Sequence, residues 1–80
     1  MSGEVERAVE LYVRSLELAD GCGDHGTAGN ALYNLATFFL NAGGSEEGAA
    51  YLRQAANRFV RAGLPLPARL SAALEATRRG

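Results

Sequence analysis

The sequence predicts an all-α fold of four antiparallel helices stacked as hairpins, and three observations support this prediction. The 80 residues include 15 Ala and 11 Leu, which are strong helix formers, whereas Ile is absent and Val is scarce. Apolar residues recur at spacings of three and four in four separate segments. The glycines cluster between those segments, around 21–29 and 43–48, where helices should stop. A chain of this length allows one small domain, so residues 1–80 are assigned to a single helical domain.

The first helix is expected over residues 4–19. Its main apolar stripe consists of Val5, Ala8, Val9, Tyr12, Leu16 and Ala19. Leu11, Val13 and Leu18 widen this stripe beyond half of the circumference, which predicts that the helix is covered on more than one side. The Gly- and Asp-rich run 20–26 is expected to end the helix and to form a loop.

The other three helices are expected over residues 27–42, 45–62 and 68–78. Thr27 is the expected N-cap of the second helix, and Gly43-Gly44 is expected to end it. Ser45 is expected to cap the third, which has two acidic residues in its first turn. The prolines at 65 and 67 turn the chain before the last helix. Because the connections are short, neighbouring helices should form antiparallel hairpins.

An internal repeat is the strongest signal in the sequence. A shift of 40 residues superimposes identical residues, among them Gly3/Gly43, Glu6/Glu46, Gly23/Gly63, Ala28/Ala68 and Ala36/Ala76. Glycines at expected helix ends, small residues and large residues each recur at equivalent positions 40 residues later. A period of this length in helical hairpins indicates stacked repeats, and the alternative is a chance match between two Ala-rich helices.

The central part of this repeat resembles the tetratricopeptide repeats. The segment 32–36 (LYNLA), followed by Phe39 and Gly43, resembles the first-helix signature of the family. The segment 46–48 (EEG), followed by Leu52 and the alanine pair 55–56, resembles the second-helix signature.

The first helix resembles a second repeat helix too, with Ala8, Tyr12 and Ser15 in the matching phase. The 40-residue spacing is similar to the longer variant found in kinesin light chains, spindle-orientation adaptors, bacterial regulators and signalling ATPases. Gly48 stands where the family usually has Ala, and Leu74 stands where it has Asn. The resemblance implies a fragment of a right-handed superhelix.

The resemblance also implies a binding surface on the second helix. In the family, first helices line a concave face that receives extended peptides, and the Asn of the triplet hydrogen-bonds the peptide backbone. The corresponding stripe here consists of Asn30, Tyr33, Asn34, Thr37 and Asn41. A carboxamide both donates and accepts, as the peptide backbone does. The alternative is that Asn34 caps a neighbouring loop or faces water.

The sequence predicts no enzyme, no cofactor and no metal site. Only one His and one Cys are present, and the run with Asp20, Cys22, Asp24 and His25 matches neither a closed zinc pattern nor an EF-hand. A net charge of −1 argues against nucleic acid and anionic membranes as partners. The N-terminal residues form neither a signal peptide nor a membrane span, so a cytoplasmic location is expected.

Two functions of different classes remain. The first is a protein–protein interaction module that binds a peptide or a partner protein, as a fragment or small relative of a tetratricopeptide-repeat regulator. The alternative is a structural domain that self-associates as a homodimer. The alternative rests on apolar residues of the terminal helices, Leu11, Val13 and Leu18 in the first and Ala72, Leu74 and Ala76 in the last.

Overall fold

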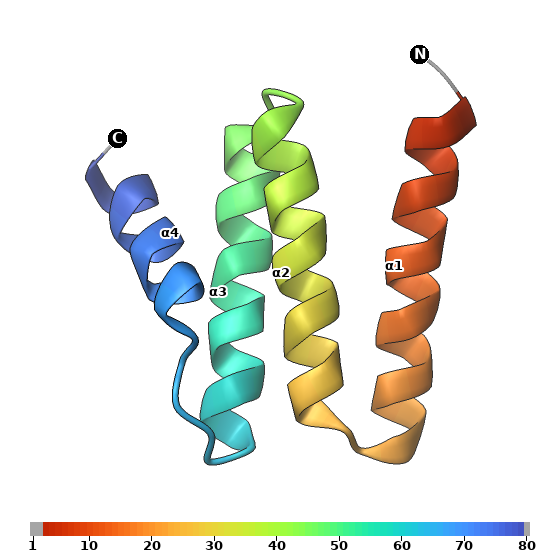
Figure 1. Ribbon diagram of the computed structural model, residues 1–80, viewed down its shortest axis with the longest axis vertical. Coiled ribbons are helices and arrows are strands. Elements are labelled where there is room, and N and C mark those ends of the chain that lie inside the picture. The colour runs from red at the N-terminus through yellow and green to blue at the C-terminus, as the bar shows by residue number, and fades with distance from the viewer. Residues whose placement is uncertain (1–2, 80) are drawn as a thin grey trace.

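The computed structural model describes residues 3–79, which form four α-helices: α1 (Gly3–Cys22), α2 (His25–Asn41), α3 (Ser45–Arg61) and α4 (Ala68–Arg79). The all-α prediction is confirmed, and residues 3–79 contain no strand. Consecutive helices run antiparallel (Figure 1). Residues 1–2 and 80, and the side chain of Val5 in the first predicted stripe, lie outside the described part of the chain.

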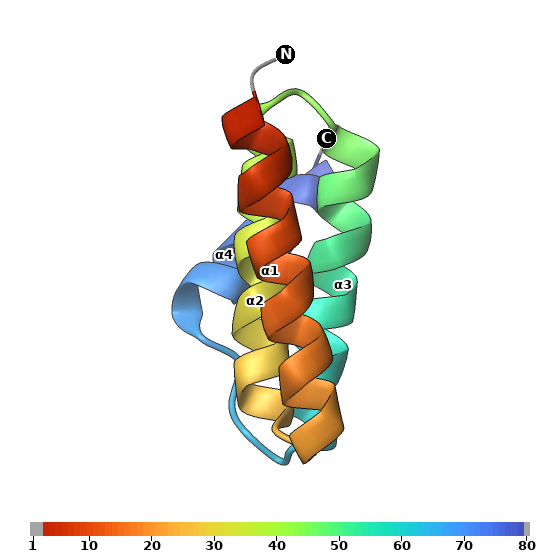
Figure 2. The same cartoon turned by 90° about the vertical axis from the view of Figure 1, so that its right-hand side faces the viewer.

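The helices form a flat slab with principal extents of 38 × 33 × 16 Å. The largest contact joins α2 and α3, while α1 packs on α2 and α4 packs on α3 (Figure 1). Seen from the α1 end, α3 and α4 lie toward opposite sides of the slab (Figure 2). Helices α1 and α4 are therefore the two edges of the structure, and α2 and α3 are its centre.

The first three helices end in the same glycine turn. Gly23, Gly43 and Gly63 have φ values of 72°, 90° and 70°, a left-handed conformation in which a β-carbon would be strained. In each turn the N–H of the following residue reaches the carbonyl five residues back, at 2.8 Å for Asp24 to Ala19. These bonds satisfy the last carbonyls of each helix. The predicted ends at Gly43 and Gly63 are confirmed.

The predicted loop over 20–26 is wrong. Helix α1 continues to Cys22, and α2 begins at His25, so only two residues separate the helices. The N-cap of α2 is Asp24 and not Thr27. The Asp24 carboxylate accepts hydrogen bonds from the Thr27 backbone N–H at 3.1 Å and from the Thr27 hydroxyl at 2.6 Å. Asp24 takes this place because it directly follows the left-handed Gly23, where the chain first leaves helical geometry.

Ser45 does not cap α3 as predicted. The N-cap is Gly44, which makes no side-chain capping bond, and Ser45 is already the first helical residue. The turn explains the difference, because Gly44 immediately follows Gly43 and its own carbonyl accepts from Gly48 N–H at 2.9 Å. The acidic first turn of α3 is confirmed, and its Glu46 and Glu47 complement the helix dipole.

The Asp24 cap predicts a pH dependence of stability. Its pKa is lowered from the usual value, chiefly by the hydrogen bond from the Thr27 hydroxyl and further by the Thr27 backbone N–H. A folded pKa below the unfolded one means that the ionised cap stabilises the fold above the unfolded pKa, and that this contribution is lost as pH falls through the folded pKa. We expect the melting temperature to fall more steeply below about pH 4 in the wild type than in Asp24→Asn, which caps without titrating. Circular dichroism melts between about pH 2 and 7 would show this, and equal slopes would contradict it.

The core lies where α2, α3 and α4 meet. Its buried cluster consists of Leu32, Ala36, Leu52, Ala55, Phe59 and Leu70. All six are apolar residues of the three helices, and they recur at helical spacings along α2 and α3. Each side chain is at most 5% exposed, and within residues 3–79 no buried side-chain nitrogen or oxygen lacks a hydrogen bond. The burial of these apolar side chains is the main source of stability.

Two glycines sit inside helices where other side chains leave no room. A β-carbon at Gly48 would lie 2.5 Å from Leu40 Cγ and 3.2 Å from the Ala36 carbonyl oxygen, which confirms close packing at this position. A β-carbon at Gly29 would lie 2.7 Å from Phe59 Cε2. Gly29 lies inside α2, as the predicted range 27–42 requires, and it is buried because the Phe59 ring occupies the space that a side chain would take.

The 40-residue repeat holds in the turns but not in the last helix. Gly23 and Gly63 adopt the same turn. The paired residues of α2 and α4 differ in burial, since Ala36 is fully buried whereas Ala76 is exposed. Leu70, which is fully buried, pairs with the exposed Asn30. The longer connection before Ala68, with its two prolines, lets α4 dock in a different register.

Candidate partner-binding surface

The five residues of the predicted stripe lie along one side of α2 but have different environments. Asn30, Asn34 and Asn41 are exposed, whereas Tyr33 and Thr37 are half-buried. Within residues 3–79 no side-chain hydrogen bond involves the three carboxamides. Asn34 does not cap a neighbouring loop, and all three carboxamides face water; their role in binding a partner stays a prediction.

Tyr33 and Thr37 are engaged within the protein. The Thr37 hydroxyl donates to the Tyr33 carbonyl oxygen at 3.1 Å, one turn back in the same helix. The Tyr33 ring packs against the core cluster, and the Arg69 guanidinium lies over it, 5.1 Å from the ring centroid. These two residues therefore support the surface and are not its free polar groups.

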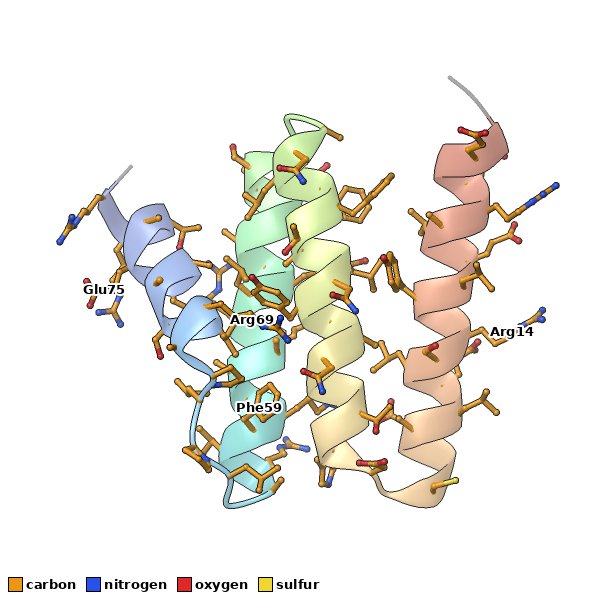
Figure 3. All side chains as sticks on the ribbon, in the orientation of Figure 1. Arg14, Phe59, Arg69 and Glu75 are labelled. Carbon is orange, nitrogen blue, oxygen red and sulfur yellow. The ribbon has the colours of Figure 1, made fainter. Side chains whose placement is uncertain are left out.

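Arg69 is a member of the surface that the sequence analysis missed. It comes from the first turn of α4, and it reaches across to Tyr33 in α2 (Figure 3). Its side chain is exposed apart from this stacking, so it adds a positive charge beside the amides. The two residues are 36 positions apart, and no local pattern links them. Only the docking of α4 against the α2–α3 hairpin brings them together.

The residues of the misassigned loop have structural roles. Asp20 near the end of α1 forms a two-pronged ion pair with Arg58 of α3, with one N–O distance of 3.0 Å. His25 Nδ1 lies 3.4 Å from the same guanidinium, and Asp24 is the N-cap described above. The ion pair joins α1 to α3 through two residues that are 38 positions apart in the sequence. Cys22, the last residue of α1, is an exposed free thiol.

None of the helices in residues 3–79 is long and apolar enough to cross a lipid bilayer.

Comparison of the chain with protein-family models, with curated proteins and with solved structures gave no match. The resemblance to tetratricopeptide repeats therefore stays a prediction, and the argument for function rests on the geometry of this surface.

Proposed function

We propose that the chain is a protein–protein interaction module that binds an extended peptide segment of a partner along α2. The observation that carries this proposal is the row of three exposed carboxamides, Asn30, Asn34 and Asn41, on one helix face. A surface helix usually turns charged side chains to water. Residues 26–41 of α2 contain no charged side chain at all.

The spacing of the amides suits a peptide in extended conformation. Asn30 and Asn41 are 11 residues apart, which corresponds to about 16 Å along a helix that rises 1.5 Å per residue. An extended chain rises about 3.3 Å per residue, so the row spans about five peptide residues. Each carboxamide offers one donor group and one acceptor, which match the N–H and C=O of a peptide backbone. Recognition of this kind depends little on the peptide's side chains.

Tyr33 and Arg69 form one side of this surface. Stacking on Tyr33 places the Arg69 guanidinium beside the amide row. The Thr37 hydroxyl donates a hydrogen bond to the Tyr33 carbonyl oxygen. The partner's side chains would meet an aromatic edge and one positive charge there. A peptide with an acidic or amide side chain opposite Arg69 would gain a charge-assisted hydrogen bond.

The proposed architecture is a fragment of a right-handed superhelix with one complete tetratricopeptide-like hairpin, α2–α3, and half a repeat on each side, so that α2 and α4 are first helices. The support for it is the signature in residues 32–43 and the repeated glycine turn. Leu74 of α4 occupies the position that corresponds to Asn34 of α2 after a shift of 40 residues. The amide contacts of this module are therefore restricted to α2. The proposal places the module within a cytoplasmic regulator, in a reducing compartment that suits its single free cysteine.

A displayed library of random peptides selected on the immobilised protein tests this function. Selected peptides are then titrated by fluorescence anisotropy against the wild type, Asn30→Ala/Asn34→Ala and the control Asn57→Ala. Asn57 is an exposed carboxamide on α3, outside the surface. Two lost hydrogen bonds at about 0.5–1.5 kcal/mol each predict a Kd raised about 5- to 150-fold by the double variant only. Enrichment of no peptide, or equal affinity of all three proteins, would contradict the proposal.

A further inference from the structure

The outer face of α1 exposes two leucines that no helix within residues 3–79 covers. Leu11 and Leu18 lie two turns apart on the helix, and their side chains are 60% and 67% exposed. Arg14 lies between them in sequence and points away from the other helices (Figure 3). Exposed large apolar side chains grouped in this way commonly mark a contact surface.

Comparison with α3 shows which kind of neighbour this face lacks. The 40-residue repeat pairs Leu11 with Tyr51, whose ring stacks on Phe39 of α2 with centroids 5.4 Å apart. It pairs Ser15, which is exposed, with Ala55, which is fully buried. Part of the face that α3 buries against α2, around Tyr51 and Ala55, is thus open at the matching positions Leu11 and Ser15 of α1. A helix placed before α1, as α2 is placed before α3, would cover it.

The opposite edge of the slab, at α4, has an apolar groove that could receive apolar side chains. Helix α4 diverges from α3 toward its C-terminal end (Figure 1), and a groove of about 490 Å³ opens between them. The floor and walls of the groove are largely apolar and include Leu40, Ala49, Ala73 and Ala76, with Glu46 at one side. Next to this groove, α4 also exposes Ala72, Glu75 and Ala76.

The charges of the two edge helices are opposite. Helix α1 has five carboxylates and two arginines, a net charge of −3. Helix α4 has three arginines and one carboxylate, a net charge of +2. The outward-pointing charges at the two edges are also opposite, Arg14 on α1 and Glu75 on α4 (Figure 3). Pairing α1 with α1, or α4 with α4, would bring like charges together, whereas pairing α1 with α4 brings unlike charges together.

We propose that the chain associates with a second copy of itself head to tail, with α1 of one copy packed against α4 and the adjoining groove of the next. In this arrangement the exposed leucines of α1 in one copy are covered by the exposed side of α4 in the next. Each contact uses two different surfaces, so every copy keeps one free α1 and one free α4 unless the assembly closes into a ring. The contact does not use Asn30, Asn34 or Asn41 of the amide row on α2.

Complementation between two variants tests the proposal. Leu11→Gln/Leu18→Gln removes the α1 surface and leaves α4 intact, while Ala72→Glu/Ala76→Glu adds two negative charges to α4 and leaves α1 intact. All four positions are exposed, so the monomer should fold, and circular dichroism checks its helix content. Val60→Gln is the matched control, because Val60 is 66% exposed and lies outside both surfaces. Mass is measured by light scattering and sedimentation from low to high micromolar concentration.

We expect the wild type and Val60→Gln to exceed the monomer mass of 8.4 kDa as concentration rises. Each double variant alone should stay at the monomer mass, and their equimolar mixture should reach twice that mass, because one intact pair of surfaces remains. Raising NaCl from about 0.05 to about 0.5 M should lower the wild-type mass, since unlike charges are screened. A monomeric wild type, self-association of either variant alone, a mixture without complex, or a salt-independent mass would each overturn the proposal.

Discussion

Leu52→Ala is expected to lower the free energy of unfolding by about 2–5 kcal/mol. Leu52 is fully buried at the centre of α3, in the cluster that joins it to α2 and α4. Truncation removes apolar contacts and leaves a cavity that the surrounding helices fill only in part. A domain of 80 residues has a total stability of about 4–12 kcal/mol, so this one change removes a large fraction of it.

Urea denaturation followed by circular dichroism measures this effect. Leu64→Ala is the control, because Leu64 is 47% exposed in the connection after α3. It loses only part of a buried side chain and should cost less than about 1 kcal/mol. A Leu52→Ala protein as stable as the Leu64→Ala protein would show that the centre of the core is not where the structure places it.

Ala36→Leu and Ala55→Leu are each expected to destabilise the protein by about 1–3 kcal/mol through overpacking. Both alanines are fully buried in the core cluster that α2, α3 and α4 share. A larger side chain has no space there, and the helices must move apart or adopt strained rotamers.

Thermal melts check this second effect. About 1 kcal/mol corresponds to about 4–8 °C in a domain of this size, so both variants should melt visibly lower than the wild type. Ala68→Leu makes the same chemical change at an exposed position in the first turn of α4, and it should leave the melting temperature nearly unchanged. Unchanged melting of Ala36→Leu and Ala55→Leu would mean that the helices face each other in another phase.

Much of the fold follows from local sequence information. Four helices are confirmed in the expected order, and the ends at Gly43 and Gly63 agree with the sequence prediction. The reason is physical, since helical spacing of apolar residues and a left-handed glycine act over a few neighbouring residues. The errors at Thr27 and Ser45 are also local. Several residues near each start qualify as a cap, and the exact length of the preceding turn decides which one is used.

The candidate surface was predicted only in part. The amide positions Asn30, Asn34 and Asn41 follow from helical periodicity and lie on one face as expected. The engagement of Tyr33 by Arg69 was not predictable, because it depends on how α4 docks after a connection that contains two prolines. The burial of Gly29 under the Phe59 ring was missed for the same reason, since it is a contact between two helices.

The sequence by itself determined that the chain forms helices, where most of them end and which faces are apolar. These properties depend on hydrogen bonds and side-chain spacings within one or two turns. The tertiary structure alone decided which helix each apolar face meets. It pairs Asp20 with Arg58, sets α4 out of phase with the 40-residue repeat, and leaves Leu11 and Leu18 of α1 uncovered. Such pairings depend on how whole helices fit together at close-packed density, which no short stretch of sequence contains.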